Sequence, residues 1–324
     1  MTQQLARYEN LVPYQSQHAQ NGIPREVMEY LAASRVYPVV SPAGLVGRNA
    51  NAHLRGWPGL CITIAECVAG HGPVAHNHTA TLETFFCIDG VFEVLWGNGL
   101  VHKIVLQPGD LCSVPSGLYR SFKNISDADA RLLVLIQGDA DMSDKIEMPR
   151  AIGSALGEKY GGNVLDLLAG INMRFQGEDT PEFTPAQMQS RIARVAGLNA
   201  VTTADGETVY PVMSPKAESR SEKSAHAPAP VECWTGLSVA LMQGGAVASA
   251  SGSGKPLAGH CQWLVNVGEG EWEITQGETV TTLKRMDMVC IEPDTQRCIK
   301  PLAAAAGAGG RLLVANQGRD TIRH

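Results

Sequence analysis

Three side chains with metal-binding chemistry lie close together in the sequence: His76, His78 and Glu83. Residues two apart on a β-strand share one face, so the two imidazoles can point into the same interior. A short turn after His78 would return the chain and aim the Glu83 carboxylate at the same point. Two histidines and one carboxylate on neighbouring strands are the usual ligands of a non-haem Fe(II) centre with open coordination positions. The sequence therefore predicts a divalent metal site, with Fe(II) as the first candidate and Mn, Ni or Zn as alternatives.

Glycines and a proline stand at fixed distances around these ligands. Residues 70–90 fit the pattern G-x5-H-x-H-x4-E-x6-G at every fixed position. A second segment fits G-x5-P-x-G-x2-H-x3-N at four positions: Gly109, Pro115, Gly117 and Asn124. These are the two signatures of the cupin superfamily, and the chain resembles its metal-dependent dioxygenases, which act on gentisate, quercetin and hydroquinones. The resemblance implies a β-barrel that holds the metal and a small oxygenated aromatic or enolic substrate.

Arg120 stands where the second signature normally supplies another histidine ligand. A guanidinium group offers hydrogen-bond donors only and stays protonated, so Arg120 cannot coordinate a metal. In one interpretation Arg120 orients the substrate by binding an anionic oxygen through its planar fork. In the other, Arg120 pairs with Glu83, opposes a divalent ion and leaves a metal-free pocket. The retention of both histidines and the glutamate at ligand spacing favours the metal.

The elements that must position these residues occur twice, because the chain repeats itself. Residues 36–42, 57–60 and 131–138 recur as 209–215, 234–237 and 311–318. Each copy contains short β-rich runs between Gly and Pro turns, which is typical of a sandwich or barrel. The predicted strands cover 60–67, 84–95, 101–106 and 131–137 in the first copy and 237–243, 263–275, 279–283, 288–292 and 311–316 in the second. The sequence therefore resembles a bicupin: an all-β chain with two double-stranded β-helix barrels from an internal duplication and a helical connector between them.

Only the first copy keeps the metal motif. Laying one copy on the other places Ser253 at the position of His76, Lys255 at that of His78 and His260 at that of Glu83. A lone histidine is more often a hydrogen-bonded polar residue than a metal ligand. We therefore expect the second barrel to be degenerate and free of metal.

The positions of proline and glycine residues indicate where the predicted domains begin and end. We predict an N-terminal helical arm at 1–35, the metal-binding barrel at 36–140, a helical connector at 141–205 and the second barrel at 206–324. The predicted helices start after Pro24, after Pro149 and at the capping box beginning with Thr184, and they cover 25–34, 150–160 and 184 to about 197. Residues 216–230, rich in Ser, Ala, Pro and charge, are expected to form a loop.

Strand parity suggests a wall for the substrate pocket. The residues that share a face with Glu83 or Arg120 are Phe85, Cys87, Leu118 and Phe122. They suit an aromatic or enolic substrate, although the same residues could equally be ordinary barrel core. Three further histidines remain candidates for an additional ligand: His53, His71 and His102.

The charge and hydropathy of the sequence limit the kinds of binding partner that we expect. The formal net charge is -6 and no stretch is dense in Lys or Arg, which argues against binding to nucleic acid or to an anionic membrane. The first residues carry no apolar run of the kind found in a secretory signal, so we expect a cytoplasmic protein. Cupins commonly assemble through their sheets, so a homodimer or higher homo-oligomer is the default expectation.

The preferred function is a non-haem Fe(II)-dependent dioxygenase, an oxidoreductase that cleaves a small anionic substrate with O2. Two alternatives stay open. One is a metal-dependent lyase, decarboxylase or isomerase without redox chemistry, and the other is a metal-free protein that binds a small molecule.

Overall fold

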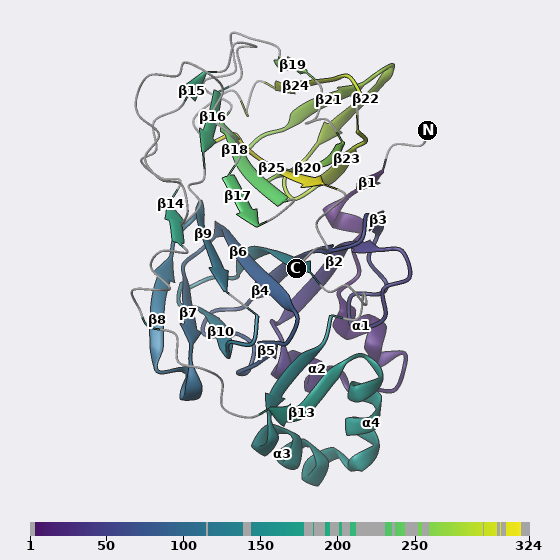
Figure 1. The fold of residues 1–324 in the computed structure, drawn as a ribbon, viewed down its shortest axis with the longest axis vertical. Helices are drawn as coiled ribbons and strands as arrows, with labels where there is room; N and C mark the ends of the chain where they lie inside the picture. Colours follow the sequence, from purple (N-terminus) through teal and green to yellow (C-terminus); the bar gives the residue numbers. More distant parts are fainter. Residues whose placement is uncertain are drawn as a thin grey trace. The chain divides into compact units, whose positions relative to one another are not determined.

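The computed structural model describes residues 4–114, 116–138, 144–177, 184, 192–194, 201–202, 208–211, 231–234, 237–243, 252–254, 259–293, 295–302, 305 and 309–318. The chain divides into two compact units, one covering residues 11–192 and the other residues 4–10 together with those from 193 onward. Both units are built mainly of antiparallel strands (Figure 1). This confirms the predicted all-β fold. No helix in these described ranges has the length and apolar character of a membrane span.

The main sheet of the unit formed by residues 11–192 runs in the order β9-β6-β11-β4-β2-β3. Its strands are β2 (Arg35–Pro42), β3 (Leu54–Gly56), β4 (Leu60–Cys67), β6 (Thr81–Asp89), β9 (Asp110–Val114) and β11 (Ala130–Gly138). A smaller sheet, β10-β7-β8, contains β7 (Phe92–Trp96), β8 (His102–Leu106) and β10 (Arg120–Asn124). A third, β13-β12-β5, contains β5 (Asn77–His78), β12 (Ile146–Pro149) and β13 (Met173–Gly177).

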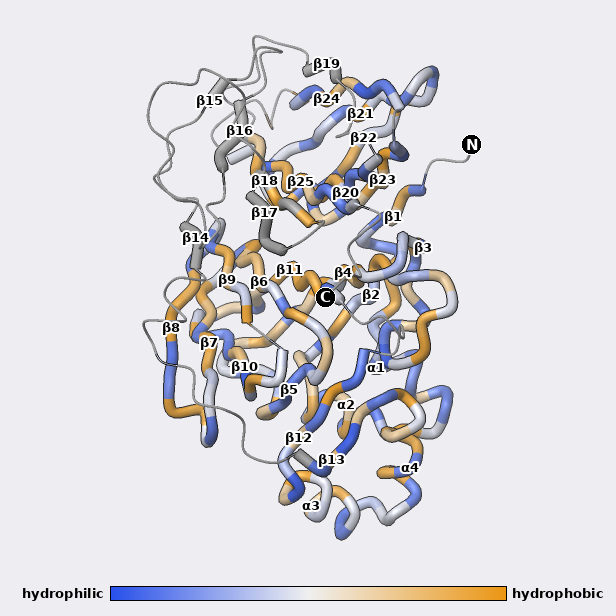
Figure 2. Tube along the Cα trace, viewed as in Figure 1, coloured by the Kyte–Doolittle hydropathy of each residue, from blue (hydrophilic) through white to orange (hydrophobic). Residues whose placement is uncertain are grey.

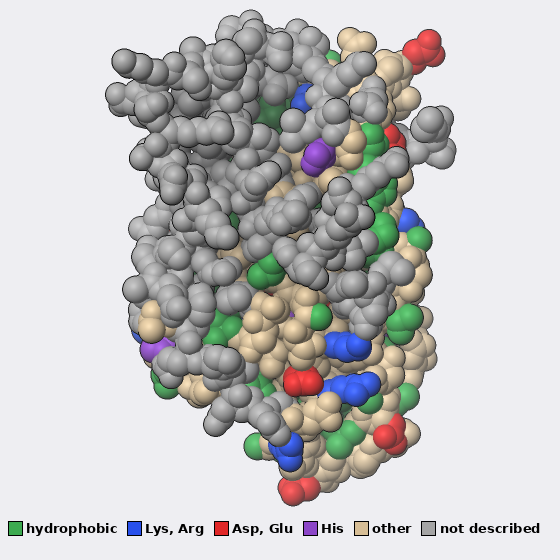
Figure 3. Space-filling view, viewed as in Figure 1, with side chains coloured by type: hydrophobic (Ala, Val, Ile, Leu, Met, Phe, Trp, Pro, Cys, Tyr) green, Lys and Arg blue, Asp and Glu red, His purple; other side chains and the backbone are tan. Residues whose placement is uncertain are grey.

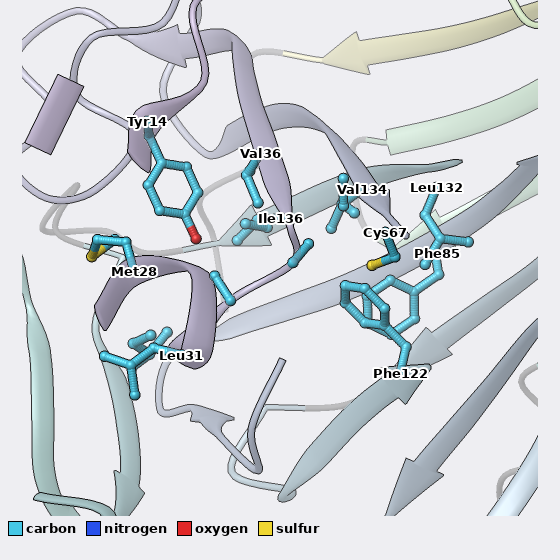
Figure 4. Close-up of a cluster of buried hydrophobic side chains, with 14 of the residues drawn as sticks. Tyr14, Met28, Leu31, Val36, Cys67, Phe85, Phe122, Leu132, Val134 and Ile136 are labelled. Atoms are coloured by element: carbon cyan, nitrogen blue, oxygen red, sulfur yellow. The ribbon is translucent and has the colours of Figure 1, made fainter. Parts of the chain in front are cut away.

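Apolar side chains on the inward faces of the strands form the core between these sheets. Figure 2 shows the hydrophobic character of β11, whose central residues are all buried. On β6 the buried face that carries Glu83 continues with Phe85, whose ring lies 5.2 Å from that of Phe122 on β10. Figure 4 shows this pair within a cluster that extends to Tyr14. Glu83 therefore projects from a strand face that continues with the apolar Phe85 and Cys87.

The described residues of this unit include the helices α1 (Tyr14–Ala19), α2 (Arg25–Leu31), α3 (Arg150–Tyr160) and α4 (Gly162–Gly170). Two short 3-10 turns lie at η1 (Tyr8–Asn10), in the other unit, and at η2 (Asn98–Leu100). Pro24 and Pro149 immediately precede α2 and α3, as the sequence predicted, because a proline ring sets φ for the start of a helix. The predicted helix from Thr184 lies mostly outside the described residues, but Ile192–Arg194 form a strand, β14, so its predicted end was wrong. The predicted loop at 216–230 lies outside the described residues.

The other unit repeats the barrel. Its larger sheet runs β1-β23-β20-β25-β18-β16-β15, with β17 paired to β18, and its smaller sheet runs β19-β24-β21-β22. The strands are β1 (Leu5–Ala6), β15 (Val201–Thr202), β16 (Thr208–Pro211), β17 (Val231–Trp234), β18 (Leu237–Gln243), β19 (Gly252–Gly254), β20 (His260–Asn266), β21 (Trp272–Gln276), β22 (Thr279–Leu283), β23 (Met288–Ile291), β24 (Arg297–Pro301) and β25 (Arg311–Gly318).

The start of the chain does not form one arm, in contrast to the predicted boundary at residue 35. The strand β1 pairs with β23, and Arg7 lies 2.6 Å from the buried carboxylate of Asp287. Asp287 also accepts a hydrogen bond from the main-chain N of Tyr8 at 3.0 Å. Residues 4–10 therefore belong with the second barrel, and α1 and α2 belong with the first.

Candidate metal centre

Two adjacent elements bring His76, His78 and Glu83 together. His78 lies on β5, and His76 precedes β5 and forms a two-way backbone bridge with Arg120, at 3.0 and 2.8 Å. Glu83 lies on β6, after the short turn that begins at Thr79. All three residues are buried, and one ligand atom from each lies within 4.8 Å of the others. The structure thus groups the residues that the sequence singled out.

The ring orientations leave the inner nitrogens available. His76 Nδ1 lies 2.9 Å from the carbonyl oxygen of Val74, which can only accept, so Nδ1 carries the proton. His78 Nδ1 lies 3.0 Å from Thr81 Oγ1 and 3.3 Å from Asp144 Oδ1. The Nε2 atoms of both rings therefore face Glu83. An outer acceptor that fixes the tautomer is a regular feature of metal-binding histidines.

The spacing among the three ligand atoms fits a cation better than hydrogen bonds. Glu83 Oε2 lies 3.8 Å from His76 Nε2 and 3.4 Å from His78 Nε2, beyond the usual hydrogen-bond range of about 2.7–3.2 Å. Among the described residues, this buried oxygen has no hydrogen-bond partner. A transition-metal ion bonds to such atoms at about 2.0–2.2 Å, which requires a gap of this size between them. His76, His78 and Glu83 could therefore bind a metal ion.

The local charges keep these groups in their metal-binding forms. Burial raises the pKa of Glu83, but the adjacent His78 and His76 outweigh it and hold this pKa well below its ordinary value. Burial lowers the pKa of His76, and the Glu83 carboxylate only partly offsets that effect. Glu83 is thus ionised and His76 neutral at neutral pH, which are the forms that coordinate metals.

These shifts predict that acid destabilises the metal-free protein. The unfolded chain takes up protons first as the pH falls, on His76 below about 6.5 and on Glu83 below about 4.5, because both folded pKa values lie lower. The free energy of unfolding, measured by urea titration from pH 8 to pH 3, should therefore decline in both ranges. The Glu83→Gln variant should lack its share of the decline below 4.5. Stability that rises between pH 7 and pH 5 would contradict this assignment.

A pocket opens onto the ligand atoms. The space within it that water molecules can occupy measures about 60 Å³. Its polar lining consists of Tyr14, Arg48, Asn49, Thr63, His76, His78 and Glu83. Its apolar lining includes Val36, Phe122, Val134, Ile136 and Met148, and Figure 4 shows the Tyr14 ring projecting from α1 toward this wall.

Arg120 lies beside Glu83 and not on the pocket wall. Its side chain is 0% exposed, and its Nε lies 3.7 Å from Glu83 Oε2. Burial lowers the pKa of Arg120 to about 10, which still leaves it charged at neutral pH. The cationic side chain in the described pocket lining is instead Arg48, from the segment between β2 and β3.

The other predicted substrate contacts are divided. Phe122 lines the pocket. Phe85, Cys87 and Leu118 are buried in the hydrophobic core and are not part of the lining. Their parity was correct, but neighbouring side chains separate them from the space.

The additional histidines lie away from the cluster. His53 is exposed, His71 Nδ1 lies 3.0 Å from Ser34 Oγ, and the His102 ring lies 5.5 Å from that of Trp96. Within the described residues none of them joins the three-residue group.

Four functional candidates escaped the sequence analysis: Tyr14, Arg48, Asn49 and Asp144. They come from α1, from the β2–β3 segment and from the short segment before β12, and no motif or strand periodicity marks them. Only the closure of these segments over the barrel brings them to the histidines.

Strand pairing corrects the alignment of the two barrels. Glu83 pairs with Ile136 and Val114, whereas the residue that pairs with the corresponding Asn316 and Ile291 is Gln262, not His260. Likewise, the residue opposite Arg297 is Gly254, just as the residue opposite Arg120 is His76. The residue that corresponds to His76 is therefore Gly254 and not Ser253. Arg297 Nε donates to Gln262 Oε1 at 2.6 Å, so the second barrel keeps the arginine beside a neutral amide. Lys255 lies outside the described residues.

Comparisons with known proteins agree with this fold. A family model described as a cupin domain matches residues 64–136. A search of curated proteins finds no match.

Three of the similar structures span nearly the whole chain. A single-residue mutant of Bacillus subtilis oxalate decarboxylase is 12% identical, with a TM-score of 0.54 over 99% of this chain and 78% of its own. The vicilin of Corylus avellana (hazelnut) is 11% identical, with a TM-score of 0.53 over 98% and 86%. A salicylate 1,2-dioxygenase from Pseudaminobacter salicylatoxidans is 10% identical, with a TM-score of 0.52 over 98% and 84%. These likenesses confirm the predicted bicupin fold and leave the reaction open.

Proposed function

We propose that this cupin protein is a metal-dependent enzyme, a non-haem Fe(II) dioxygenase that cleaves a small, anionic, oxygenated aromatic or enolic substrate. The observation that carries the proposal is the convergence of two Nε2 atoms and one carboxylate oxygen on the wall of a pocket. His76, His78 and Glu83 would hold the ion. Such an ion supplies open positions at which substrate oxygens and O2 bind together.

The charge balance of the pocket supports an anionic substrate. Arg48 and Arg120 are the buried cations, and Glu83 and Asp144 are the buried anions beside them. These four charges cancel, so a divalent ion would add uncompensated positive charge to a buried site. Burying such charge is costly unless a counter-charge accompanies it, and an anionic substrate provides one.

The size and lining of the pocket support a compact substrate. Space of about 60 Å³ accommodates on the order of four to six water molecules. Arg48, Asn49 and the Tyr14 hydroxyl can orient substrate oxygens, and the burial that raises the Tyr14 pKa keeps this hydroxyl a neutral donor. The apolar wall formed by residues such as Val134 and Ile136 would exclude competing water.

Specific observations also support two alternative functions. The same ligand set suits Mn, Ni or Zn, and one of the similar structures is an oxalate decarboxylase, so a lyase, decarboxylase or isomerase without redox chemistry is the second candidate. The third is a metal-free binding protein, since the charge of Arg120 lies 3.7 Å from Glu83. The small-molecule substrate, the homodimer and the absence of nucleic-acid or membrane partners remain proposals. Figure 3 shows acidic and basic side chains interspersed on the described part of one face, which supports the absence of a nucleic-acid partner.

Metal content and oxygen dependence separate these functions. The protein purified anaerobically should contain close to one equivalent of metal, and the Fe(II)-loaded form should consume O2 with one of a panel of phenolic and enolic acids. Glu83→Gln should lose both properties. Turnover without O2, or with Zn(II) in place of Fe(II), would support the non-redox candidate. Ligand binding that persists with strong chelators, in a protein that takes up no metal, would support the metal-free one.

A further inference from the structure

The outer nitrogen of His78 faces a carboxylate that no sequence pattern marked. His78 Nδ1 lies 3.0 Å from Thr81 Oγ1 and 3.3 Å from Asp144 Oδ1. A threonine hydroxyl can donate or accept, so Thr81 alone does not determine which ring nitrogen carries the proton. An ionised carboxylate can only accept. The negative charge of Asp144, 3.3 Å from Nδ1, therefore favours the proton on that nitrogen and leaves the Nε2 lone pair facing Glu83.

Asp144 is itself held in place from the β2–β3 segment. Arg48 Nη1 donates to the main-chain oxygen of Asp144 at 2.9 Å, and Arg48 Nη2 lies 3.0 Å from Oδ2. Asn49 Nδ2 donates to the same Oδ2 at 3.1 Å. Because two donors occupy Oδ2, the other oxygen, Oδ1, is directed at His78.

The environment of Asp144 fixes its carboxylate. Arg48 Nη2, 3.0 Å from Oδ2, supplies the counter-charge, and Asn49 Nδ2 donates to the same oxygen. Its φ of 44° lies in the left-handed region, which Asp and Asn adopt more readily than other residues with side chains. Asparagine is therefore the substitution that best preserves the backbone at this position.

The two histidines differ in how their outer nitrogens are fixed. His76 uses the carbonyl of Val74, two residues away along the same chain segment. His78 uses the nearby Thr81 hydroxyl and, in addition, the carboxylate of Asp144, which is distant in sequence and is held by Arg48 and Asn49. The geometry of one ligand is thus coupled to the segments that close the pocket.

We propose that Asp144 is a positioning residue of the metal centre, held by Arg48 and Asn49, and that its carboxylate orients His78 and sets the affinity for the metal. The inference rests on the proposed metal site. Outer partners of this kind, when removed, cost about 10- to 100-fold in metal affinity. Asp144 acts through His78 and lies outside the set of ligand atoms.

Co(II) binding to the full-length metal-free protein tests this role without any activity measurement. Asp144→Asn should weaken Co(II) binding by about 10- to 100-fold and alter the visible absorption spectrum of bound Co(II), because the orientation of His78 changes. Asp89→Asn is the matched control, since Asp89 also pairs with an arginine, Arg131 at 3.1 Å, and belongs to no metal-site contact. This control should leave both the affinity and the spectrum unchanged.

A second variant covers the case in which Asp144→Asn fails to fold, because that change leaves Arg48 buried without its counter-ion. Asn49→Ala keeps both charges and removes one donor from Asp144, and it should weaken Co(II) binding severalfold with a changed spectrum. Unchanged Co(II) binding in a folded Asp144→Asn, or in Asn49→Ala if the first variant does not fold, would overturn the proposal while leaving the metal site intact. If the unaltered protein binds no Co(II), the proposed function fails and this inference fails with it.

Discussion

His78→Ala is expected to abolish metal binding and every metal-dependent activity. His78 is buried and its Nε2 lies 3.4 Å from Glu83 Oε2, so no other described side chain can move into its place without rearranging the core. The loss of affinity should far exceed the roughly 10- to 100-fold that removal of an outer partner costs. Stability provides a second measurement. At a free metal concentration of about 100 times Kd, binding should add about 2.7 kcal/mol to the unaltered protein and nothing to the variant.

Three histidines of this unit that lie away from the cluster, His53, His71 and His102, supply the controls for that experiment. A gain of about 2.7 kcal/mol corresponds to a rise in unfolding temperature of roughly 5 to 10 °C for a unit of this size. His53→Ala, His71→Ala and His102→Ala should keep this rise, because their rings lie away from the cluster. A variant among these three that loses metal would identify a fourth ligand. Metal binding by His78→Ala at the original affinity would refute the assignment of the site.

Arg120→Met is expected to destabilise the metal-free protein by about 3–5 kcal/mol, the range for removing one partner of a buried ion pair. The Glu83 carboxylate would then be left with less compensating charge in a buried site. A divalent ion can supply that charge, so adding metal should restore much of the lost stability, and the Kd for metal should fall below that of the unaltered protein. Arg120→His should also bind metal at least as well, since it restores the usual cupin ligand, and should turn over less because the imidazole occupies an open position.

The duplication provides a matched control for Arg120. Arg297 holds the same place in the second barrel but donates to a neutral amide, that of Gln262 at 2.6 Å. Arg297→Met leaves an unsatisfied amide instead of a buried charge, and should cost only about 1–3 kcal/mol. Metal should not restore that loss. If Arg120→Met weakens substrate binding while metal affinity and apo stability stay unchanged, then Arg120 contacts the substrate and its role through Glu83 is refuted. If it creates metal binding in a parent that has none, the metal-free function is favoured.

Local patterns in the sequence were sufficient to predict the general architecture. The predicted strands at 60–67, 237–243 and 279–283 coincide with β4, β18 and β22, since alternation along a strand is visible within a few residues. The grouping of His76, His78 and Glu83 also follows from local order, because it needs only one strand face and one short turn. The duplication was evident because three segments recur in the same order.

The equivalence between the barrels could not be obtained in the same way. The alignment placed His260 at the position of Glu83, and the strand register places Gln262 there. Residues 260 and 262 share one strand face, so parity gives no means of distinguishing them. Cross-strand hydrogen bonds, which join residues far apart in the chain, determine the register.

The cupin signatures, the twofold repeat, the grouping of His76, His78 and Glu83 and the departure at Arg120 can all be identified from the residues alone. The cation that lines the pocket and the carboxylate beside His78 become evident only when the segments are placed in space. Arg48 and Asp144 are distant in sequence from each other and from the histidines, and each is an ordinary polar residue in its local context. Their proposed role arises when the β2–β3 segment and the segment before β12 close on the barrel, where the buried ion pair of Arg48 and Asp144 lies beside His78.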